Sequence, residues 1–522
     1  MFEFMRVPAK ASLLAVTSTA AATAATIHVP GEHGSIQEGI DAATDGDEVV
    51  VAVGRYYESW IRFRGKAISV RGSSGPFDKA VVHAQHQGPV FVFTENEGRE
   101  SRLSGFQLTA GESVCGGGLR CENASPTIEN CLIYDNRALG WDDAHGGGAH
   151  IHGGSPVFLD CTFADNMAEF NGGAIFALVA EVTLIESSFT DNTAVKGSAI
   201  FASTASVRIA ESDVRNGRGG AFYLQRSDLL GRDLEFAYNT SEQIGRNYAA
   251  GIYAWESEVS LLDSVFRENV GASSGAVEIV DNSTGIFRGC EFESNWGIEA
   301  GGLEVRNAAG WVTNCIFTAN TSERAGAVLM GGGGTLDAVA TAFRGGFGRA
   351  CGAIATESEA RLGLRGCLLV ENIGLEASAI HSLESSATLV NCTVVEGLSP
   401  SGPAVLAARD AMLNIESSIL WANDPVQIGA DPSASVEVDW SDVEGGFAGE
   451  GNIDADPLFH SGLHVDYLLR PLSPCVDAGD PEVEDHVSDW HPRWPNWYPN
   501  GARSDMGAYG GTDNWRWIPT GS

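Results

Sequence analysis

The sequence predicts an all-β fold: a single-stranded, right-handed parallel β-helix solenoid with a short N-terminal capping helix and an irregular C-terminal cap. Two recurring patterns lead to this prediction, a small–small–Ala–aliphatic step and a Phe-x-x-Asn step, both returning about every twenty-five residues. A unit of this length cannot bury its own apolar face, so neighbouring units must stack to be stable. The chain is therefore expected to form one long solenoid rather than several globular domains.

The Phe-x-x-Asn step sets the period of the repeat. Its first position recurs at separations of 26, 25, 22, 30, 26, 25, 26 and 26 residues. The residues at that position are Phe163, Phe189, Val214, Phe236, Phe266, Phe292, Phe317, Phe343 and Leu369. The Ala of the other step stays fifteen residues ahead, as Ala174 does with Phe189. Between these marks, segments such as 181–186 alternate apolar and polar residues, which is typical of strands.

The two residues of the Phe-x-x-Asn step are expected to have structural roles. The Phe should stack inward on the Phe of the neighbouring coil. The Asn should occupy a left-handed or bent backbone conformation at a corner, and its side chain should bond to the next coil.

The N-terminus has the features of a secretory signal. Arg6 and Lys10 precede a stretch of apolar and small residues, and cleavage is expected between Ala22 and Ala25. The stretch is short for a membrane span, and the rest of the sequence offers no candidate window. We therefore predict export to a secreted or cell-surface location of a bacterium, with no transmembrane segment beyond the signal peptide.

The pattern divides the chain into four regions. They are a signal peptide over residues 1–25, an N-terminal cap and first coil over 26–75, β-helix repeats over 76–445 and a C-terminal cap segment over 446–522.

Three stretches resemble known β-helix proteins. Residues 26–58, with an apolar-patterned segment at 35–43, resemble the start of pectin-lyase-like β-helices, which implies an amphipathic helix over the open core. The Gly-Gly-Ala-aliphatic and Phe-x-x-Asn repeats between about 116 and 400 resemble the polymorphic outer-membrane protein family, whose surface-exposed β-helix is implicated in adhesion. Residues 454–459, 467–470, 473–480 and 505–509 resemble the terminal segment of many secreted bacterial β-helix proteins. We interpret both ends as caps that keep strand edges from pairing.

The charge of the chain restricts its partners. The formal net charge is −36, with 68 Asp and Glu against 32 Lys and Arg. Phosphate backbones are repelled by such a surface, so nucleic acid is excluded as a partner. A polyanionic glycan would need divalent cations as bridges, and Ca²⁺ is the cation considered. We predict no other cofactor and no metal site.

The ten cysteines fall partly in phase with the repeat. Cys131 and Cys161 occupy the same place in successive coils. Stacked coils lie about 4.8 Å apart, which allows either a disulfide or a ladder of buried thiols. A local bridge between Cys115 and Cys121 is also predicted.

A row of aromatic side chains is expected on the outer face of the first strand of each coil. The predicted ligand-binding residues are Phe176, Phe201, Tyr223, Tyr253 and Trp255. An exposed aromatic strip suits stacking against the apolar faces of sugar rings, and large exposed apolar patches mark contact sites. The alternative is a ladder of aromatic pairs that stabilises the sheet or lies beneath long loops.

Charged residues adjoin this row. Glu278 and Glu304 should lie about 5 Å apart on successive coils, with Arg306 beside them. Such a pair could act as acid and base or nucleophile in glycoside cleavage, or hold calcium. These three residues are candidates for catalysis only if the protein is an enzyme; the alternative is solvated charges on a β-face.

Three functions remain open at this point. The leading hypothesis is a non-catalytic, exported β-helix that binds polysaccharide or cell-surface glycan along the aromatic strip. The second is a polysaccharide lyase or glycoside hydrolase acting in the same groove. The third is a structural envelope or matrix protein, because fold alone does not choose among them.

Overall fold

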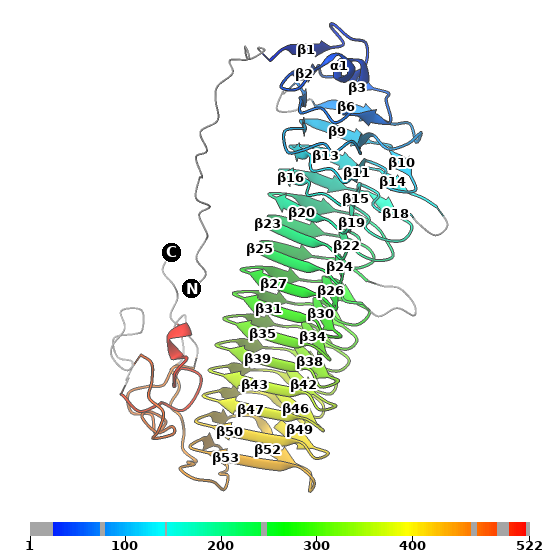
Figure 1. Ribbon diagram of the computed structural model, residues 1–522. Helices are drawn as coiled ribbons and strands as arrows, with labels where there is room; N and C mark the ends of the chain where they lie inside the picture. Colours follow the sequence, from blue (N-terminus) through cyan, green and yellow to red (C-terminus); the bar gives the residue numbers. More distant parts are fainter. Residues whose placement is uncertain are drawn as a thin grey trace.

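The chain forms a long solenoid of parallel strands with an irregular segment at its C-terminal end (Figure 1). This computed structural model describes residues 24–73, 79–140, 144–241, 248–460, 467–487 and 501–517. The predicted fold class is confirmed: nearly every strand is paired in parallel with the equivalent strand of the next coil. The predicted signal peptide lies almost entirely outside the described residues. No helix among the described residues is long and apolar enough to cross a membrane.

One coil shows how the chain turns. It consists of β26 (Ile252–Trp255), β27 (Glu258–Leu262), β28 (Val265–Arg267) and β29 (Val270–Gly271). Equivalent strands of successive coils pair to form four parallel stacks, named here the β26, β27, β28 and β29 stacks after this coil. The β27 stack runs from β1 (Thr26–Val29) to β53 (Ser435–Asp439), so nearly the whole described chain contributes to it.

The strands used below belong to these stacks. In the β26 stack they are β15 (Ala149–His152), β19 (Ile175–Leu178), β22 (Ile200–Ser203), β24 (Phe222–Gln225), β30 (Val277–Val280) and β34 (Leu303–Arg306). In the β27 stack they are β20 (Glu181–Ile185), β35 (Ala309–Thr313), β39 (Thr335–Val339), β43 (Arg361–Arg365) and β47 (Ser386–Val390). In the β28 stack they are β32 (Glu291–Glu293), β44 (Leu368–Val370) and β48 (Thr393–Val395), and in the β29 stack β33 (Trp296–Gly297), β37 (Thr321–Ser322), β41 (Phe347–Gly348) and β45 (Ile373–Gly374).

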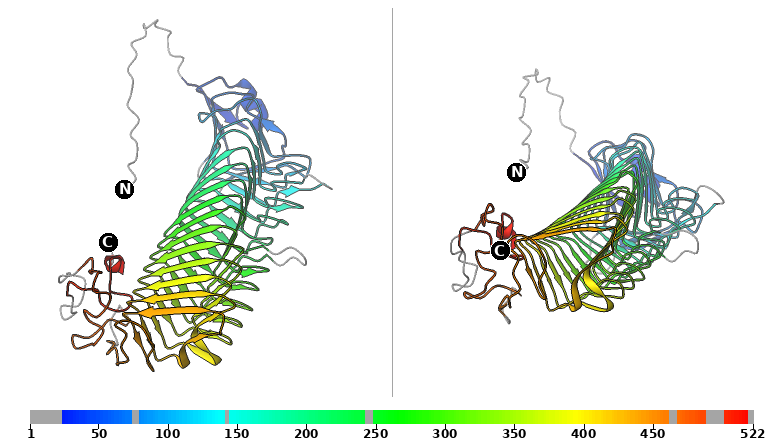
Figure 2. Two further views of the ribbon diagram at one scale, coloured as in Figure 1. Left: turned by 60° about the horizontal axis from the view of Figure 1, so that its bottom comes forward. Right: turned by 90° about the horizontal axis from the view of Figure 1, so that it is seen from below.

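One apolar core runs along the solenoid from Ile27 to Val443. It is made by alternate residues of each strand, as expected when one face of a strand is buried. The phenylalanines of the repeat stack inside it, and the rings of Phe292 and Phe317 lie 4.3 Å apart and nearly parallel. Successive coils are progressively rotated with respect to one another (Figure 2), as expected from the right-handed twist of parallel strands accumulated over many coils.

The asparagines of the repeat form a buried ladder between coils. Asn269 donates from Nδ2 to the carbonyl of Phe236 at 2.9 Å and to Oδ1 of Asn295 at 2.9 Å. The predicted bond to the next coil is therefore present. The prediction of a left-handed Asn is wrong, because the residue before it takes that conformation, for example Glu268 with φ of 51°. The Asn keeps an ordinary backbone because its side chain must point inward to continue the ladder.

The two ends of the solenoid differ. At the N-terminal end, helix α1 (Ile36–Ala42) begins at the N-cap Ser35, whose side chain accepts from the Glu38 backbone N–H at 3.2 Å. Ile36 and Ile40 are fully buried against the first strands, so the helix closes the core as predicted.

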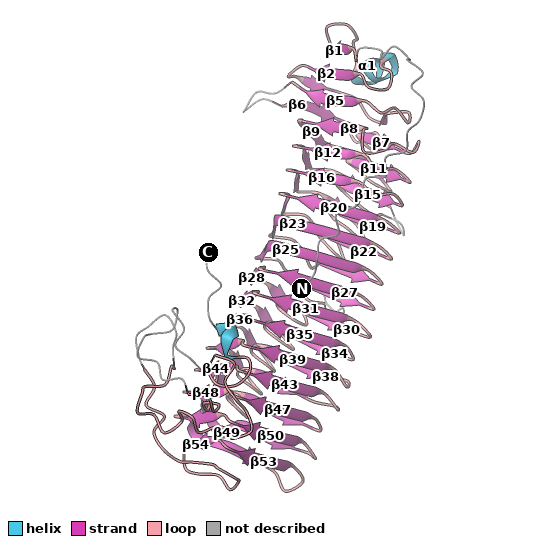
Figure 3. Cartoon of the chain, turned by 60° about the vertical axis from the view of Figure 1, so that its left-hand side comes forward, coloured by secondary structure: helices cyan, strands magenta, loops and turns pink. Residues whose placement is uncertain are grey.

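The C-terminal segment is irregular, as predicted, but most of it does not cover the last strand edge. Leu468, Ala508 and Tyr509 pack on the outer side of β44 and β48 (Figure 3). Among its described residues, 450–453 pair along the final edge, where the Trp440 N–H donates to the Glu450 carbonyl at 2.7 Å. The outer side of β44 and β48 is apolar, and the C-terminal segment buries it.

The structure decides between a disulfide and a ladder of buried thiols for the stacked cysteines. Cys131 and Cys161 are buried free thiols in the core. The predicted bridge from Cys115 to Cys121 is wrong, since Cys121 is a free thiol that points into the core from a strand. Burial raises the pKa of the Cys131 thiol to about 11.

Candidate functional site

The outer row of the β26 stack has the order that the repeats predict. Its members, one from each coil, are Arg120, His150, Phe176, Phe201, Tyr223, Tyr253, Glu278, Glu304, Leu329, Ala355 and His381. Trp255 lies two residues beyond Tyr253 and is in register with Arg306 two coils later. The structure therefore brings the aromatic and charged candidates together along one face.

The aromatic part of this row is not the exposed strip that the sequence suggests. Phe176, Phe201 and Tyr223 are only 6, 5 and 7% exposed. Their rings stack at 5.3 and 5.2 Å between centroids. Of the two interpretations left open, burial favours the stabilising ladder for these three residues.

The cover comes from described residues in the connections between a strand of the β29 stack and the next strand of the β26 stack. The ring of His145 stacks on Phe176 at 4.4 Å, and Lys196 Nζ lies 4.4 Å from the centroid of Tyr223. Tyr248 packs edge-on against Tyr223 at 5.1 Å. Strand alternation distinguishes inward from outward residues but carries no information about a loop that returns over the outward face.

Tyr253 and Trp255 remain partly exposed at the end of the ladder. The guanidinium of Arg226 lies 4.9 Å above the Trp255 ring and also donates to Glu256 at 2.7 Å. The guanidinium of Arg226 therefore occupies one face of the indole.

The carboxylate pair is also buried. Glu278 is 6% exposed and Glu304 is 1% exposed. Glu304 accepts hydrogen bonds from the hydroxyls of Ser273 and Ser274 at 2.7 and 3.0 Å, and Arg306 donates to its other oxygen. The two serines belong to the covering connection, so the pair ties that connection to the sheet.

The protonation of the pair follows from its surroundings. Burial, and then the neighbouring Glu304, raise the pKa of Glu278 well above its ordinary value. Burial raises the pKa of Glu304 as well, while Arg306 and the two serine hydroxyls lower it. Burial and the neighbouring carboxylate therefore favour the neutral form of Glu278, whose Oε2 is buried with no hydrogen-bond partner among the described residues.

This geometry does not suit catalysis. A glycosidic bond must reach both carboxyl groups, whereas here the covering connection separates them from solvent. The described residues also contain no group of three or more His, Cys, Asp or Glu side chains placed to hold a metal ion. At the other end of the row, burial lowers the pKa of His150 to about 4, which keeps that imidazole neutral at pH 7.

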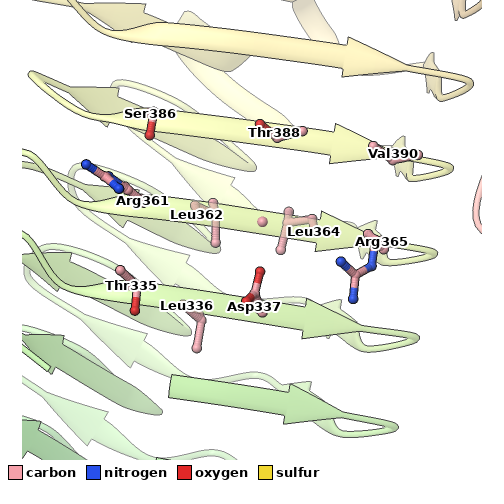
Figure 4. A pocket seen from close by; sticks show the side chains of 11 residues that line it. Thr335, Leu336, Asp337, Arg361, Leu362, Leu364, Arg365, Ser386, Thr388 and Val390 are labelled. Carbon is pink, nitrogen blue, oxygen red and sulfur yellow. The ribbon is translucent and has the colours of Figure 1, made fainter. Parts of the chain in front are cut away.

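An open groove on the β27 stack is not among the sites that the sequence predicts. It is a cavity of about 520 Å³ that crosses β39, β43 and β47 (Figure 4). Its polar side chains are those of Thr335, Asp337, Arg361, Arg365, Ser386 and Thr388, and Gly363 lies between them without a side chain. Among the described residues, only those of β39, β43 and β47 line the groove. At one end of the groove Arg365 forms an ion pair with Asp513 of the C-terminal segment at 3.3 Å.

Trp311 lies beside the groove. It is 43% exposed, and it is paired directly with Asp337 of the next coil in the row that continues to Gly363 and Thr388. The outward residues of the β27 stack could have indicated this site from the sequence. The site that the sequence predicts lies on the outward residues of the β26 stack instead.

Comparison with known proteins identifies the fold. The family model described as the right handed beta helix region matches residues 62–239, 117–273 and 250–441. Comparison with curated proteins gave no match.

Several solved structures share the general architecture at low similarity. A Dettilon tailspike protein is 10% identical over 78% of this chain and 68% of its own, with a TM-score of 0.31. A mannuronic acid specific polysaccharide family 6 lyase from human gut microbiota is 12% identical over 83% and 91%, with a TM-score of 0.32. The pectate lyase Pel9A is 12% identical over 94% and 97%, with a TM-score of 0.17. TM-scores this low carry no argument about function.

Proposed function

We propose that this chain, which belongs to the right-handed β-helix family, is an exported, non-catalytic protein. It binds a glycan on the open face of the β27 stack. The observation that carries this proposal is the solvent-facing groove around Gly363. Export rests on the signal-like N-terminal sequence.

The groove has the polar lining that a sugar requires. Three hydroxyl groups, from Thr335, Ser386 and Thr388, surround the open floor at Gly363. Asp337 adds hydrogen-bond acceptors to this set. A cavity of about 520 Å³ lies within the ~300–1,000 Å³ range of small-ligand sites. Hydroxyl and carboxylate groups around an unobstructed floor favour a polyhydroxylated ligand over an apolar one.

Trp311 supplies an apolar platform next to these polar groups. Neighbouring strands are about 4.8 Å apart, so Trp311 and Gly363 are about 10 Å apart along the axis. A sugar chain lying along the axis would therefore reach both the indole and the groove. The half-exposed Tyr253 and Trp255 belong to a different stack and are proposed as a second, smaller contact.

The buried carboxylates support a binding role rather than an enzymatic one. Glu278 and Glu304 are the paired acids of the outward row, and neither can be reached from the groove on the β27 stack. Arg306 is engaged with Glu304 and is not free to act as a base.

Binding can be tested with variants that change only the groove. A glycan array should first identify a ligand for the mature protein, and calorimetry should then compare Trp311→Ala and Gly363→Val with the wild type. The Cβ at position 363 would lie 2.6 Å from Asp337 Oδ1, the end of a side chain that can rotate away, so the valine fills the groove without disturbing the fold. Thr183→Ala in β20 is the matched control, because Thr183 occupies the same outward row far from the groove.

The expected result is that both groove variants lose at least ten-fold in affinity and the control loses none. Binding lost only in a Tyr253→Ala, Trp255→Ala double variant would move the site to the β26 stack. New reducing ends or unsaturated products would show an enzyme, and absence of binding to any glycan would favour a structural role.

A further inference from the structure

A stripe of apolar side chains lies open on the β29 stack. Its members are Trp296, Ile298, Phe347, Ile373, Leu375 and Leu398, and they are 37–45% exposed. Four of five successive coils contribute these residues, since β33, β37, β41 and β45 are paired in order and Ile373 continues to Leu398. The coil of β37 has Thr321 at this position instead. We call these residues, with Glu323 and Arg349 between them, the β29 stripe.

Elsewhere on this molecule, long apolar outward rows have a cover. The aromatic ladder of the β26 stack lies under the returning connections, and the apolar outer side of β44 and β48 lies under the C-terminal segment. The β29 stripe has no such cover in the described part of the chain. Large exposed apolar patches mark interaction surfaces.

The order of residues along the stripe shows what fits it. One row, taken coil by coil, reads Ile298, Glu323, Arg349, Leu375. The backbone N–H of Leu375 donates to the Arg349 carbonyl at 3.1 Å, so these positions are true neighbours between coils. The row is apolar, acidic, basic, apolar, and reversing it exchanges the acid with the base.

The two charges are available for a partner. Both Glu323 and Arg349 are exposed, and neither forms an ion pair within 4.0 Å in the part of the chain that the structure describes. Side chains of opposite charge one coil apart could have paired with each other, yet they do not.

We propose that the β29 stripe is the interface of a two-fold symmetric dimer in which two copies of this chain lie antiparallel. In that arrangement Ile298 faces Leu375 of the second copy, and Glu323 faces its Arg349. The same contacts recur on the other side of the axis, as a two-fold interface requires. Trp296 and Phe347 supply aromatic anchors of the kind that dominate interface energetics.

Charge also favours this surface for self-association. Each copy carries a formal net charge of −36, so most of one surface repels the same surface of another copy. The charged pair within the β29 stripe sums to zero, and the rest of the stripe is apolar. Two copies can therefore approach here without the repulsion that operates elsewhere.

Charge reversal tests the pairing directly. Sedimentation equilibrium of the mature protein should give the mass of two chains at micromolar concentration. Glu323→Arg places arginine opposite arginine twice in each dimer, and Arg349→Glu places glutamate opposite glutamate twice. Each single variant should raise the dimer dissociation constant at least ten-fold, while the Glu323→Arg, Arg349→Glu double variant should restore it. Glu291→Arg, an exposed change in β32 outside the stripe, is the matched control.

All three positions are exposed, so we expect every variant to fold and the change in dissociation constant to report on the interface alone. A wild-type monomer at all concentrations would overturn the proposal. A dimer that tolerates both single reversals, or one that the double variant fails to restore, would also overturn it. A parallel arrangement predicts no rescue, so rescue is specific to the antiparallel dimer.

Discussion

Replacing Glu278 by Gln should stabilise the protein, and the gain should increase with pH. In the folded state Glu278 is buried next to Glu304, and both burial and that neighbour raise its pKa well above the ordinary value. The folded chain therefore keeps the Glu278 proton to a higher pH than the unfolded chain, which releases it above about pH 4.3. Stability is lost as pH rises from the unfolded pKa towards the folded pKa. Glutamine is neutral at every pH and removes this loss.

The repulsion between the two carboxylates sets the size of the effect. Two like charges on neighbouring strands about 5 Å apart repel by about 3 kcal/mol at an effective dielectric constant of about 20. The variant should therefore gain up to about 3 kcal/mol in free energy of unfolding at pH 7, and less at pH 5.

Urea unfolding of the wild type and of Glu278→Gln between pH 5 and pH 8 measures this difference. Glu291→Gln, on the exposed face of β32, controls for the loss of one negative charge and should change stability by less than about 0.5 kcal/mol. A gain that is constant across the pH range, or a variant less stable than the wild type at pH 7, would refute the buried-proton argument.

Three further substitutions or treatments test the core. Asn269→Ala should cost about 1–3 kcal/mol for each ladder partner left unsatisfied, measured by urea unfolding; a loss below 1 kcal/mol would contradict a continuous ladder. Phe292→Ala should cost about 3–5 kcal/mol, because the ring packs between those of Phe266 and Phe317 at 5.1 and 4.3 Å; a smaller cost would mean that the stack collapses around the gap. Cys131, with its pKa raised to about 11, should react with a disulfide reagent at pH 8 only in denaturant; rapid labelling of the native protein would contradict its burial.

The sequence specifies the repeating part of this structure because each coil obeys the same local rules. The spacing of Phe292 and Phe317 already shows that the two rings belong to neighbouring coils. The register of Tyr253 with Glu278 likewise follows from counting residues along the repeat. These relations depend only on period and alternation, which a single sequence displays.

The candidate site depends on contacts that lie outside the repeat. The burial of Tyr223 is decided by Lys196 and Tyr248, which lie on connections whose path the strand pattern does not encode. The groove at Gly363 arises because one outward position has no side chain and its neighbours are small or polar. Both features arise from side-chain size and loop path in particular coils, so the consensus of the repeat does not predict them.

The asparagine ladder has gaps, and these divide the solenoid mechanically. Gly217, Gly346 and Gly397 stand where the ladder would continue. Each donates its backbone N–H to the Oδ1 of the next asparagine, as Gly217 does to Asn239 at 2.9 Å. Because glycine has no side-chain amide, the side-chain hydrogen bonds between coils are missing at these positions. Under bending or torsion the molecule should therefore behave as stiff rods joined at these three coils. Two of these gaps, at Gly346 and Gly397, lie in the coils on either side of the coil that carries Gly363, so we expect bending of the solenoid to alter the groove.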